Sequence, residues 1–356
     1  MTTEAEALLP GGEAPRRILV VRLSSLGDVV RITGVLAALR RLFPAAEIVA
    51  VTGAAAAPLL RPDPSLDRLL VARPARRAVA LSFDAWRQLR PLRRAGIDLA
   101  LDLQGTDRSA RWMRWSDAAC KAGRGAGAAD WRVAVAPDYG RGDVEESALI
   151  LRRLGLDPGP CLPRLATEPA AEAAVSALLA RHGLSAEGFV AINPFSRWLA
   201  KTWPADSWKA LLPRLAAASG RPLVVTGDRR EAAAAEALLR GLPAGMALSL
   251  AGAVDLAGLA ALLRRAALLV TGDSGPMHMA AALDTPVVAL FGPTWPERAG
   301  PQGEGHVVLQ AARLPHYHAY RQEKHQAATA AIAVESVLEA ALKTLAARAP
   351  RRAVGA

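Results

Sequence analysis

The stretch Val270-Thr-Gly-Asp-Ser-Gly-Pro-Met-His-Met279 decides the fold. An apolar run from Ala266 to Val270 ends in small polar residues, and a helix-like run from Pro276 to Leu283 follows at once. A strand–turn–helix junction of this kind directs free backbone N–H groups into the turn, where a phosphate fits. Ser274 stands where it can cap the helix, and the two glycines of the stretch allow a ligand to approach the backbone closely.

A second junction of the same type lies near the start of the chain, at Leu23-Ser-Ser-Leu-Gly-Asp28, directly after the apolar run Arg17–Arg22. It does not match G-x-G-x-x-G, and the next apolar run ends in Thr52-Gly53 without an acidic residue to hold a ribose. Both features argue against dinucleotide binding in this half. Two such junctions in two halves predict two nucleotide-binding-like domains that face a cleft.

Short apolar runs alternate with longer amphipathic ones in both halves, which predicts an α/β fold of two Rossmann-like parallel-sheet domains. Residues 154–169 contain four prolines and two glycines and mark the linker. The segments expected along the chain are a disordered leader at 1–15, an N-terminal acceptor-binding domain at 16–165, a C-terminal nucleotide-sugar-binding domain at 166–325, and at 326–356 a tail with a helix that is a candidate to return to the N-terminal domain.

Individual elements follow from the same periodicity. Expected strands are 17–22, 47–52, 68–71, 98–103, 189–193, 222–226, 267–271 and 287–291. Expected helices are 29–42, 78–95 (broken at Pro91), 171–181, 205–218, 229–240, 256–265, 276–283 and 331–346.

Composition narrows the choice of partners and compartment. The chain has 356 residues, 52% of them hydrophobic, and a formal net charge of +11. A basic chain favours nucleic acid, phosphorylated sugars or an acidic membrane face, although an arginine-biased genome explains the charge equally well. No nucleic-acid-binding signature is present. Two cysteines outside any CxxC motif indicate a reducing, cytoplasmic compartment, and no uncharged apolar run reaches the roughly 18 residues of a membrane span.

Asp28 has two interpretations. As a first-turn carboxylate it balances the helix dipole, which is a purely structural role. As a general base at a cleft it takes a proton from an acceptor hydroxyl. The helix dipole lowers its pKa and weakens it as a base, which is tolerable if the proton leaves only as the new bond forms.

Lys201 lies in a polar loop that leads from the strand ending at Asn193 to a helix beginning near Pro204. A lysine before a helix N-terminus is a point charge suited to a diphosphate, and the alternative is a solvated surface lysine. Ser196 can hydrogen-bond a phosphate or a sugar. Trp203 and Trp208 are expected to anchor the following helix in the core rather than to stack on a base.

Asp273 stands beside the expected phosphate pocket, where a carboxylate would repel a diphosphate. It is therefore expected to accept hydrogen bonds from sugar hydroxyls, while Ser274 and Gly275 form the helix start. His278, one turn into the helix, is expected to be a capped or core histidine. No metal site and no cofactor are expected, because the histidines between 306 and 325 lack cysteine or acidic partners and no DxD pair stands out. Residues 314–325 are expected to form an exposed interdomain loop.

Five blocks in order resemble the ADP-heptose:lipopolysaccharide heptosyltransferases of glycosyltransferase family 9, and the resemblance spans roughly residues 16 to 345. The blocks are Arg17-Ile-Leu-Val-Val-Arg-Leu-Ser-Ser-Leu-Gly-Asp-Val-Val30, Asp102-Leu-Gln-Gly105, Lys201-Thr-Trp-Pro204, Gly272-Asp-Ser-Gly-Pro-Met-His278 and Phe291-Gly-Pro-Thr294. The resemblance implies a two-domain GT-B architecture and an inverting, metal-independent transfer of heptose from ADP-heptose to a Kdo or heptose hydroxyl of the lipopolysaccharide inner core.

The resemblance also implies roles for individual residues. Asp28 would be the catalytic base, and Lys201 the phosphate contact that stabilises the leaving group. The donor-side residues would be Ser196, Lys201, Glu231, Asp273, Ser274, Gly275 and His278. The candidates for acceptor binding, chosen for their position and charge in the first half rather than carried over from the family, are Ser25, Arg31, Gln104, Arg108 and Arg111, with Arg22 and Arg114 as further cations.

An anionic lipopolysaccharide precursor as acceptor would bring the protein to the cytoplasmic face of the inner membrane as a peripheral protein. Relatives often carry His-Thr-x-Pro where this chain has Arg31-Ile-Thr-Gly34, so the acceptor can differ. Three alternatives stay open: a sugar-nucleotide epimerase, a heptosyltransferase that modifies protein hydroxyls, and a non-catalytic sugar-nucleotide-binding module.

Overall fold

The computed structural model describes residues 13–73, 78–125, 131–136, 138 and 140–347. It divides into two compact units, Met1–Glu168 and Pro169–Ala356, and the division falls inside the proline-rich segment expected to be the linker. Residues 1–12 of the leader expected at 1–15, and the end of the tail at 348–356, lie outside the described residues.

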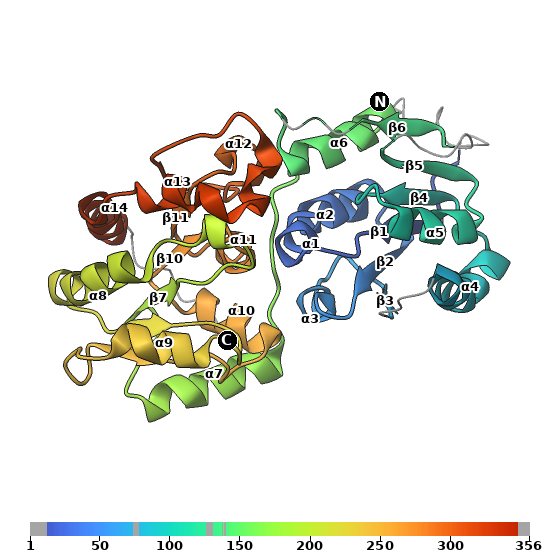
Figure 1. Cartoon of the computed structure of the whole chain (residues 1–356). Helices are drawn as coiled ribbons and strands as arrows, with labels where there is room; N and C mark the ends of the chain where they lie inside the picture. Colours follow the sequence, from blue (N-terminus) through green and yellow to red (C-terminus); the bar gives the residue numbers. More distant parts are fainter. Residues whose placement is uncertain (1–12, 74–77, 126–130, 137, 139, 348–356) are drawn as a thin grey trace. The chain divides into compact units, whose positions relative to one another are not determined.

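The first unit is built on a six-stranded, entirely parallel sheet with the order β3-β2-β1-β4-β5-β6 (Figure 1). Its strands are β1 (Arg17–Val21), β2 (Glu47–Gly53), β3 (Arg68–Ala72), β4 (Leu99–Asp102), β5 (Cys120–Arg124) and β6 (Val133–Val135). In the register, Ile18 of the central strand pairs with Ile48 on one side and Leu99 on the other. This is the order of a doubly wound nucleotide-binding sheet, whose direction of growth reverses between β1 and β4.

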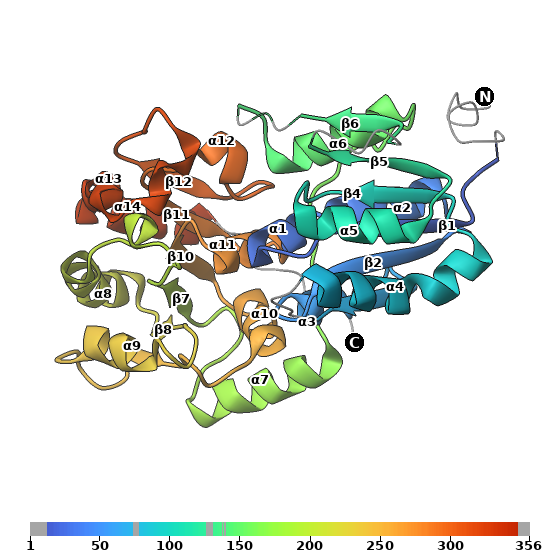
Figure 2. The same ribbon diagram turned by 45° about the vertical axis from the view of Figure 1, so that its right-hand side comes forward.

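Helices cover both faces of this sheet, as expected for buried parallel strands. They are α1 (Leu26–Arg31), α2 (Thr33–Leu42), α3 (Ala57–Leu60), α4 (Ala78–Ala95), α5 (Asp107–Ser116) and α6 (Asp143–Arg153). Ile18 and Val20 share one core cluster with residues of α2 and α6, whereas Leu19 and Val21 share another with residues of α4 and α5. Figure 2 shows α4 and α5 lying along the sheet.

The second unit repeats this topology, because its parallel sheet has the order β12-β11-β10-β7-β8-β9. Its strands are β7 (Val190–Asn193), β8 (Leu223–Val225), β9 (Ala247–Ser249), β10 (Leu268–Gly272), β11 (Val287–Phe291) and β12 (Val307–Gln310). Numbered within the unit, these strands run in the same 3-2-1-4-5-6 order, and the reversal lies between β7 and β10. The prediction of two Rossmann-like sheets is therefore confirmed.

The helices of the second unit also lie on its sheet and on one another. They are α7 (Pro169–Arg181), α8 (Ala205–Ser219), α9 (Ala232–Leu239), α10 (Leu256–Arg264), α11 (Gly275–Ala282), α12 (Pro296–Ala299), α13 (Gln326–Ala330) and α14 (Val334–Ala347), with short 3₁₀ turns η2 (Leu199–Lys201), η3 (Tyr317–Arg321) and η4 (Glu323–His325). Residues of α8, α9 and α14 share the core cluster of β7, β8 and β10, and α10 packs against α7 and α11.

Four details correct the expected elements. The helix expected at 29–42 is two helices that meet at Ile32, and α4 continues through Pro91 rather than breaking there. The packing of α4 against α5 compensates for the one backbone hydrogen bond that a proline removes. Helix α14, a candidate to return to the first domain, instead belongs to the second unit, where it packs on α8 and on β10–β12. Strands β5, β6, β9 and β12 were not expected.

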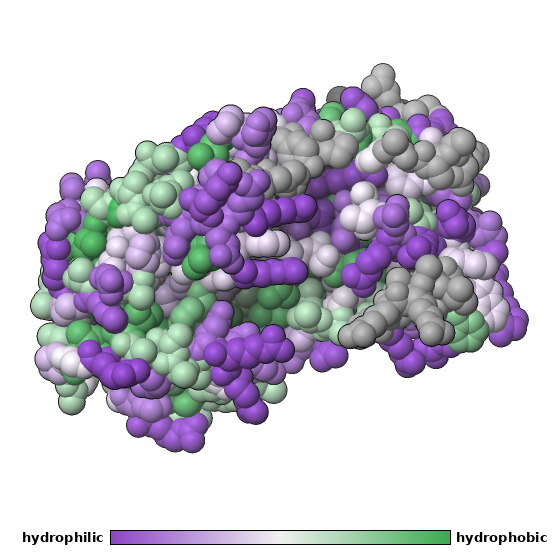
Figure 3. Space-filling view, viewed as in Figure 1, coloured by the Kyte–Doolittle hydropathy of each residue, from purple (hydrophilic) through white to green (hydrophobic). Residues whose placement is uncertain are grey.

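The described residues include no helix that is both long and apolar enough to cross a membrane. Hydrophilic side chains cover much of the visible face of each unit, with green apolar patches interspersed (Figure 3). The packed interiors of the two sheets therefore account for most of the large aliphatic side chains that are buried.

Candidate active site

The reversal of strand order marks one candidate site in each unit. In open parallel sheets, ligands bind beyond the carboxyl ends of the strands at the point where the order reverses. In the first unit this point lies between β1 and β4, which lead into the loops at 22–25 and 103–106. In the second unit it lies between β7 and β10, which lead into the loops at 194–198 and 273–274. All five resembling blocks contribute a strand end or a loop at these edges.

Asp28 lies in the first turn of α1, directly after β1. Its Oδ2 accepts hydrogen bonds from the backbone N–H of Ser25, at 2.9 Å, and from the Ser25 hydroxyl, at 3.0 Å. This contact closes the helix start, so the structural interpretation of Asp28 is realised. The carboxylate is nevertheless 24% exposed, and it therefore remains accessible to a small polar group.

Two arginines also hold the Asp28 carboxylate. Arg22 lies 3.1 Å from Oδ2, and Arg31 donates to Oδ1 from one turn further along α1. Burial alone would raise the pKa of Asp28, but the two guanidinium groups and the Ser25 N–H hold this pKa well below its ordinary value. The carboxylate is therefore ionised at physiological pH.

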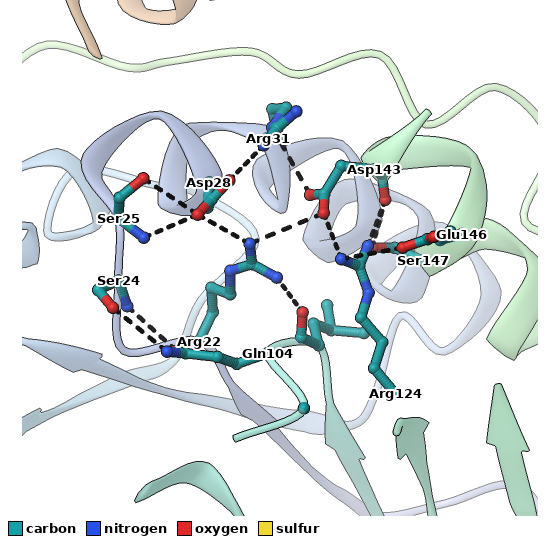
Figure 4. A network of polar contacts seen from close by, with 12 residues as sticks. Arg22, Ser24, Ser25, Asp28, Arg31, Gln104, Arg124, Asp143, Glu146 and Ser147 are labelled. Carbon is teal, nitrogen blue, oxygen red and sulfur yellow. Dashed lines mark hydrogen bonds and ion pairs between the residues drawn. The ribbon is translucent and has the colours of Figure 1, made fainter. Parts of the chain in front are cut away.

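The arginines belong to a larger network that extends to α6 (Figure 4). Asp143, the first residue of α6, lies 3.8 Å from Arg22, 3.6 Å from Arg31 and in hydrogen-bond contact with Arg124. Arg124 ends β5 and also lies 3.3 Å from Glu146. We call these six residues, Arg22, Asp28, Arg31, Arg124, Asp143 and Glu146, the arginine–carboxylate network.

Arg31 is therefore not an accessible cation for an anionic acceptor, because it is only 7% exposed and its guanidinium contacts two carboxylates. This changes the role suggested for it. Helix α5 offers cations of a different kind: Arg108 and Arg114 are exposed, Arg111 is half-buried, and the three form no ion pair with the described residues. Their spacing of three residues places them along one side of α5.

The sequence block at 102–105 ties β4 to the loop after β1. The side-chain oxygen of Gln104 accepts hydrogen bonds from the backbone N–H groups of Leu23, at 2.6 Å, and Ser24, at 3.2 Å. Asp102 in turn accepts from the N–H groups of Gln104 and Gly105. Gln104, expected to contact the acceptor, thus holds the loop that leads to Asp28, whereas Ser25 is exposed at that loop.

In the second unit, Lys201 and Asp273 form an ion pair with 2.6 Å between Nζ and Oδ2. Their side chains are only 12% and 7% exposed, so Lys201 is not a solvated surface lysine. The Lys201 ammonium also lies 4.3 Å from the centre of the Tyr320 ring. Burial would raise the pKa of Asp273, but Lys201 and, to a smaller extent, His278 hold it below its ordinary value.

The N-terminus of α11 begins beside this pair. Ser274 occupies the N-cap position, but its side chain does not cap the helix as expected; its hydroxyl instead lies 3.1 Å from that of Thr271. The Ser274 hydroxyl therefore does not cap the first N–H groups of the helix, where the positive end of the helix dipole also lies. Gly272 is needed here because a Cβ would lie 2.7 Å from the Lys201 carbonyl oxygen.

The remaining donor-side residues lie at the same edge of the second sheet. Ser196 is half-buried in the loop after β7, and His278 is buried in α11. Glu231 lies just before α9 and accepts a hydrogen bond from the N–H of Asp228; burial raises its pKa. Trp203 and Trp208 pack edge to face and are both 1% exposed, which confirms them as core anchors.

Residues 314–325 are largely exposed, as expected, but they contain short 3₁₀ turns where a plain loop was expected. They contain η3 and η4 and belong to the second unit, where Tyr320 contacts Trp198 and Tyr317, with ring centres 5.6 and 5.8 Å apart. A signal for this aromatic cluster was present in the sequence. Aromatic residues make up only 4% of the chain, yet two of its three tyrosines fall in this segment. Asp143, Arg124 and Glu146 were missed altogether.

Comparison with known proteins agrees with this geometry. The family model of glycosyltransferase family 9 (heptosyltransferase) matches residues 85–329. The chain belongs to this family. It is therefore a glycosyltransferase, and the architecture is GT-B.

Individual relatives match over most of their length. Lipopolysaccharide heptosyltransferase 1 of Pseudomonas aeruginosa is 29% identical over 313 residues, which are 82% of this chain and 83% of that one. Lipopolysaccharide heptosyltransferase 3 of Escherichia coli is 26% identical over 276 residues, 75% of this chain and 81% of that one. The solved structure of E. coli ADP-heptose lps heptosyltransferase II superposes with a TM-score of 0.75 at 23% identity, covering 93% of this chain and 98% of that one.

Proposed function

We propose that the enzyme transfers heptose from ADP-heptose to a Kdo or heptose hydroxyl of the lipopolysaccharide inner core, with inversion at the anomeric carbon and without a metal ion. Family membership and the names of the relatives support the donor sugar and the class of acceptor. The observation that carries the proposal is the pair of strand-end sites, one with an ionised carboxylate and one with a buried ammonium beside a helix N-terminus.

The donor diphosphate would lie on the N-terminus of α11, within reach of Lys201. Backbone N–H groups and the helix dipole favour an anion there. Lys201 would stabilise the negative charge that develops on the departing diphosphate, which is the task a metal ion performs in other transferases. Asp273 would keep Lys201 in place and accept hydrogen bonds from sugar hydroxyls. The described residues contain no group of three or more metal-ligating side chains.

Asp28 would act as the general base. As the acceptor oxygen forms its bond to the anomeric carbon, the bond from that carbon to the diphosphate oxygen breaks, and ADP leaves with the electron pair. The acceptor proton passes to Asp28 in the same step. Because the pKa of Asp28 is low, it accepts the proton only when the attacking oxygen has already gained positive charge. Attack from the face opposite the diphosphate gives inversion.

The acceptor would be recognised by its negative charges. Kdo carboxylates and lipid A phosphates suit the accessible arginines of α5, Arg108, Arg111 and Arg114. An acceptor of this kind is held in a lipid leaflet, so the enzyme would work as a peripheral protein on the cytoplasmic face of the inner membrane.

The test combines donor binding with turnover. Among ADP-, UDP- and GDP-linked sugars, ADP-heptose should give the largest rise in melting temperature of the purified chain. Transfer to a heptose-deficient lipopolysaccharide precursor should then proceed unchanged in EDTA and give the inverted anomer by NMR. Donor turnover without acceptor would indicate an epimerase. Transfer to protein hydroxyls alone, or binding without any transfer, would also contradict the proposal.

A further inference from the structure

Asp143 is a buried carboxylate that the reaction described above leaves without a task. It begins α6 and is 4% exposed. It contacts the same two guanidinium groups that hold Asp28, and in addition Arg124 from β5. Figure 4 shows Arg22 and Arg31 lying between the two carboxylates, with Asp28 on one side and Asp143 on the other.

We propose that Asp143 is a positioning residue that sets the basicity of Asp28 by sharing Arg22 and Arg31 with it. The inference rests on the proposed role of Asp28 as the base. It assigns to α6 a part in the chemistry that none of the resembling sequence blocks carries.

The charge balance of the arginine–carboxylate network supports this role. The arginine–carboxylate network joins three guanidinium groups to three carboxylates through ion pairs between described residues. When Asp28 takes the acceptor proton, its own charge is lost and the three guanidinium groups face two carboxylates. Asp143, which touches all three, is the group best placed to stabilise that state.

Without the charge of Asp143, Arg22 and Arg31 would keep Asp28 as the one ionised carboxylate of this pair. Their charge would then favour ionised Asp28 further and make its protonation during the transfer more costly, because a low-dielectric site strengthens each ion pair. A base weakened in this way slows proton removal. Burial would raise the pKa of Asp143 itself, but Arg31, Arg22 and Arg124 hold it far below its ordinary value, so its charge persists throughout the reaction.

Two further carboxylates lie near these guanidinium groups. Glu146, from the next turn of α6, lies 3.3 Å from Arg124. Asp102, at the end of β4, accepts two backbone N–H groups, and burial raises its pKa. We therefore expect the removal of Asp143 to leave an excess of positive charge around Asp28, which these two carboxylates do not neutralise.

The experiment measures transfer by the full chain with one and two substitutions. Asp143→Asn keeps the size and polarity of the side chain and removes its charge. We expect its kcat to fall about tenfold or more, with the acceptor KM changed by less than about twofold. The double variant R124Q/D143N removes one positive charge as well, and it should recover at least half of that loss on a logarithmic scale.

The matched control is Asp67→Asn, which removes a carboxylate paired with Arg40 at the start of β3, away from the loops described above. Its kcat should stay within about twofold of wild type. Asp28→Asn serves as the reference. If it transfers at the wild-type rate, the proposed function fails; if it is inactive but the Asp143 variants behave otherwise than expected, only the present inference fails.

A purely structural role for Asp143 predicts a different pattern. The double variant would then be as slow as Asp143→Asn or slower, and that result in folded protein, checked by circular dichroism and melting, would overturn the proposal. Wild-type kcat for Asp143→Asn would overturn it too. If Asp143→Asn does not fold, the double variant still decides: folded protein with kcat reduced more than about a hundredfold contradicts charge balance.

Discussion

The two sheets of this enzyme have the same strand order but opposite chemistry at the point where that order reverses. In the first unit, three arginines are engaged by three carboxylates, and the accessible group is an ionised aspartate. In the second unit, one lysine is held between an aspartate and a tyrosine ring beside an uncapped helix N-terminus. The comparison teaches that topology decides where a site lies, whereas the loop residues decide whether that site is suited to accept a proton or to bind a phosphate.

The largest effect is expected from removing the positive charge of the second site. Lys201→Met should lower kcat/KM for the donor by about a hundredfold to a thousandfold, because a charge aimed at the leaving group is lost. The measurement is steady-state kinetics with varied ADP-heptose. Lys209→Met, which removes an exposed lysine on α8, is the control and should leave the kinetics unchanged. If Lys201→Met had a kcat/KM close to that of the wild type, the proposal that Lys201 stabilises the departing diphosphate would be contradicted.

A smaller effect is expected from the ring that lies over Lys201. Tyr320→Leu should raise the donor KM about fivefold to thirtyfold, since a cation–π contact at a partly buried site is worth roughly 1–2 kcal/mol. Tyr320→Phe retains the ring face and should stay close to wild type. Equal losses in both variants would show that the tyrosine hydroxyl, rather than the ring, is what matters.

The third prediction concerns acid and has the smallest effect near neutral pH. The folded-state pKa values of Asp28 and Asp143 are depressed by their arginines, so the unfolded chain binds more protons than the folded one below the ordinary value of 3.8. Their stabilisation is complete above that pH and is lost as the pH falls towards the folded-state values. In the second unit Asp273 is lowered in the same sense but less strongly.

Acid should therefore open the first unit before the second. Brief pepsin digestion between about pH 4 and pH 2, with the peptides assigned by mass spectrometry, tests this directly, because pepsin cuts the transiently open state. Early cleavage within the second unit, while the first stays intact, would contradict the role of the network in stability.

Both helix–strand junctions were predictable from sequence because their signals are local. Small residues end an apolar run and a helix begins at once, as at Asp28 and Ser274. The strands at 120–124 and 247–249 escaped detection because Cys-Lys-Ala-Gly-Arg and Ala-Leu-Ser are not apolar runs; they are strands because they extend existing sheets.

The partners of the site residues were not predictable in this way. Arg31 was assigned to an acceptor because a positive charge, at a position where relatives often carry His-Thr-x-Pro, suits an anionic sugar. Its burial depends on Asp143, which joins it only when α6 packs beside α1 and α2. Tyr320 likewise reaches Lys201 only through the fold of the second unit. Such contacts between distant segments leave no periodic pattern in the sequence.

The central claim is that Asp28 takes the proton and the second unit holds the donor. Single-turnover transfer and calorimetric ADP binding, both measured on Asp28→Asn, test that division of labour most directly. The account predicts ADP affinity within about twofold of wild type and a transfer rate reduced about a hundredfold to ten-thousandfold. Transfer at the wild-type rate by the folded variant, or loss of ADP binding together with transfer, would contradict it.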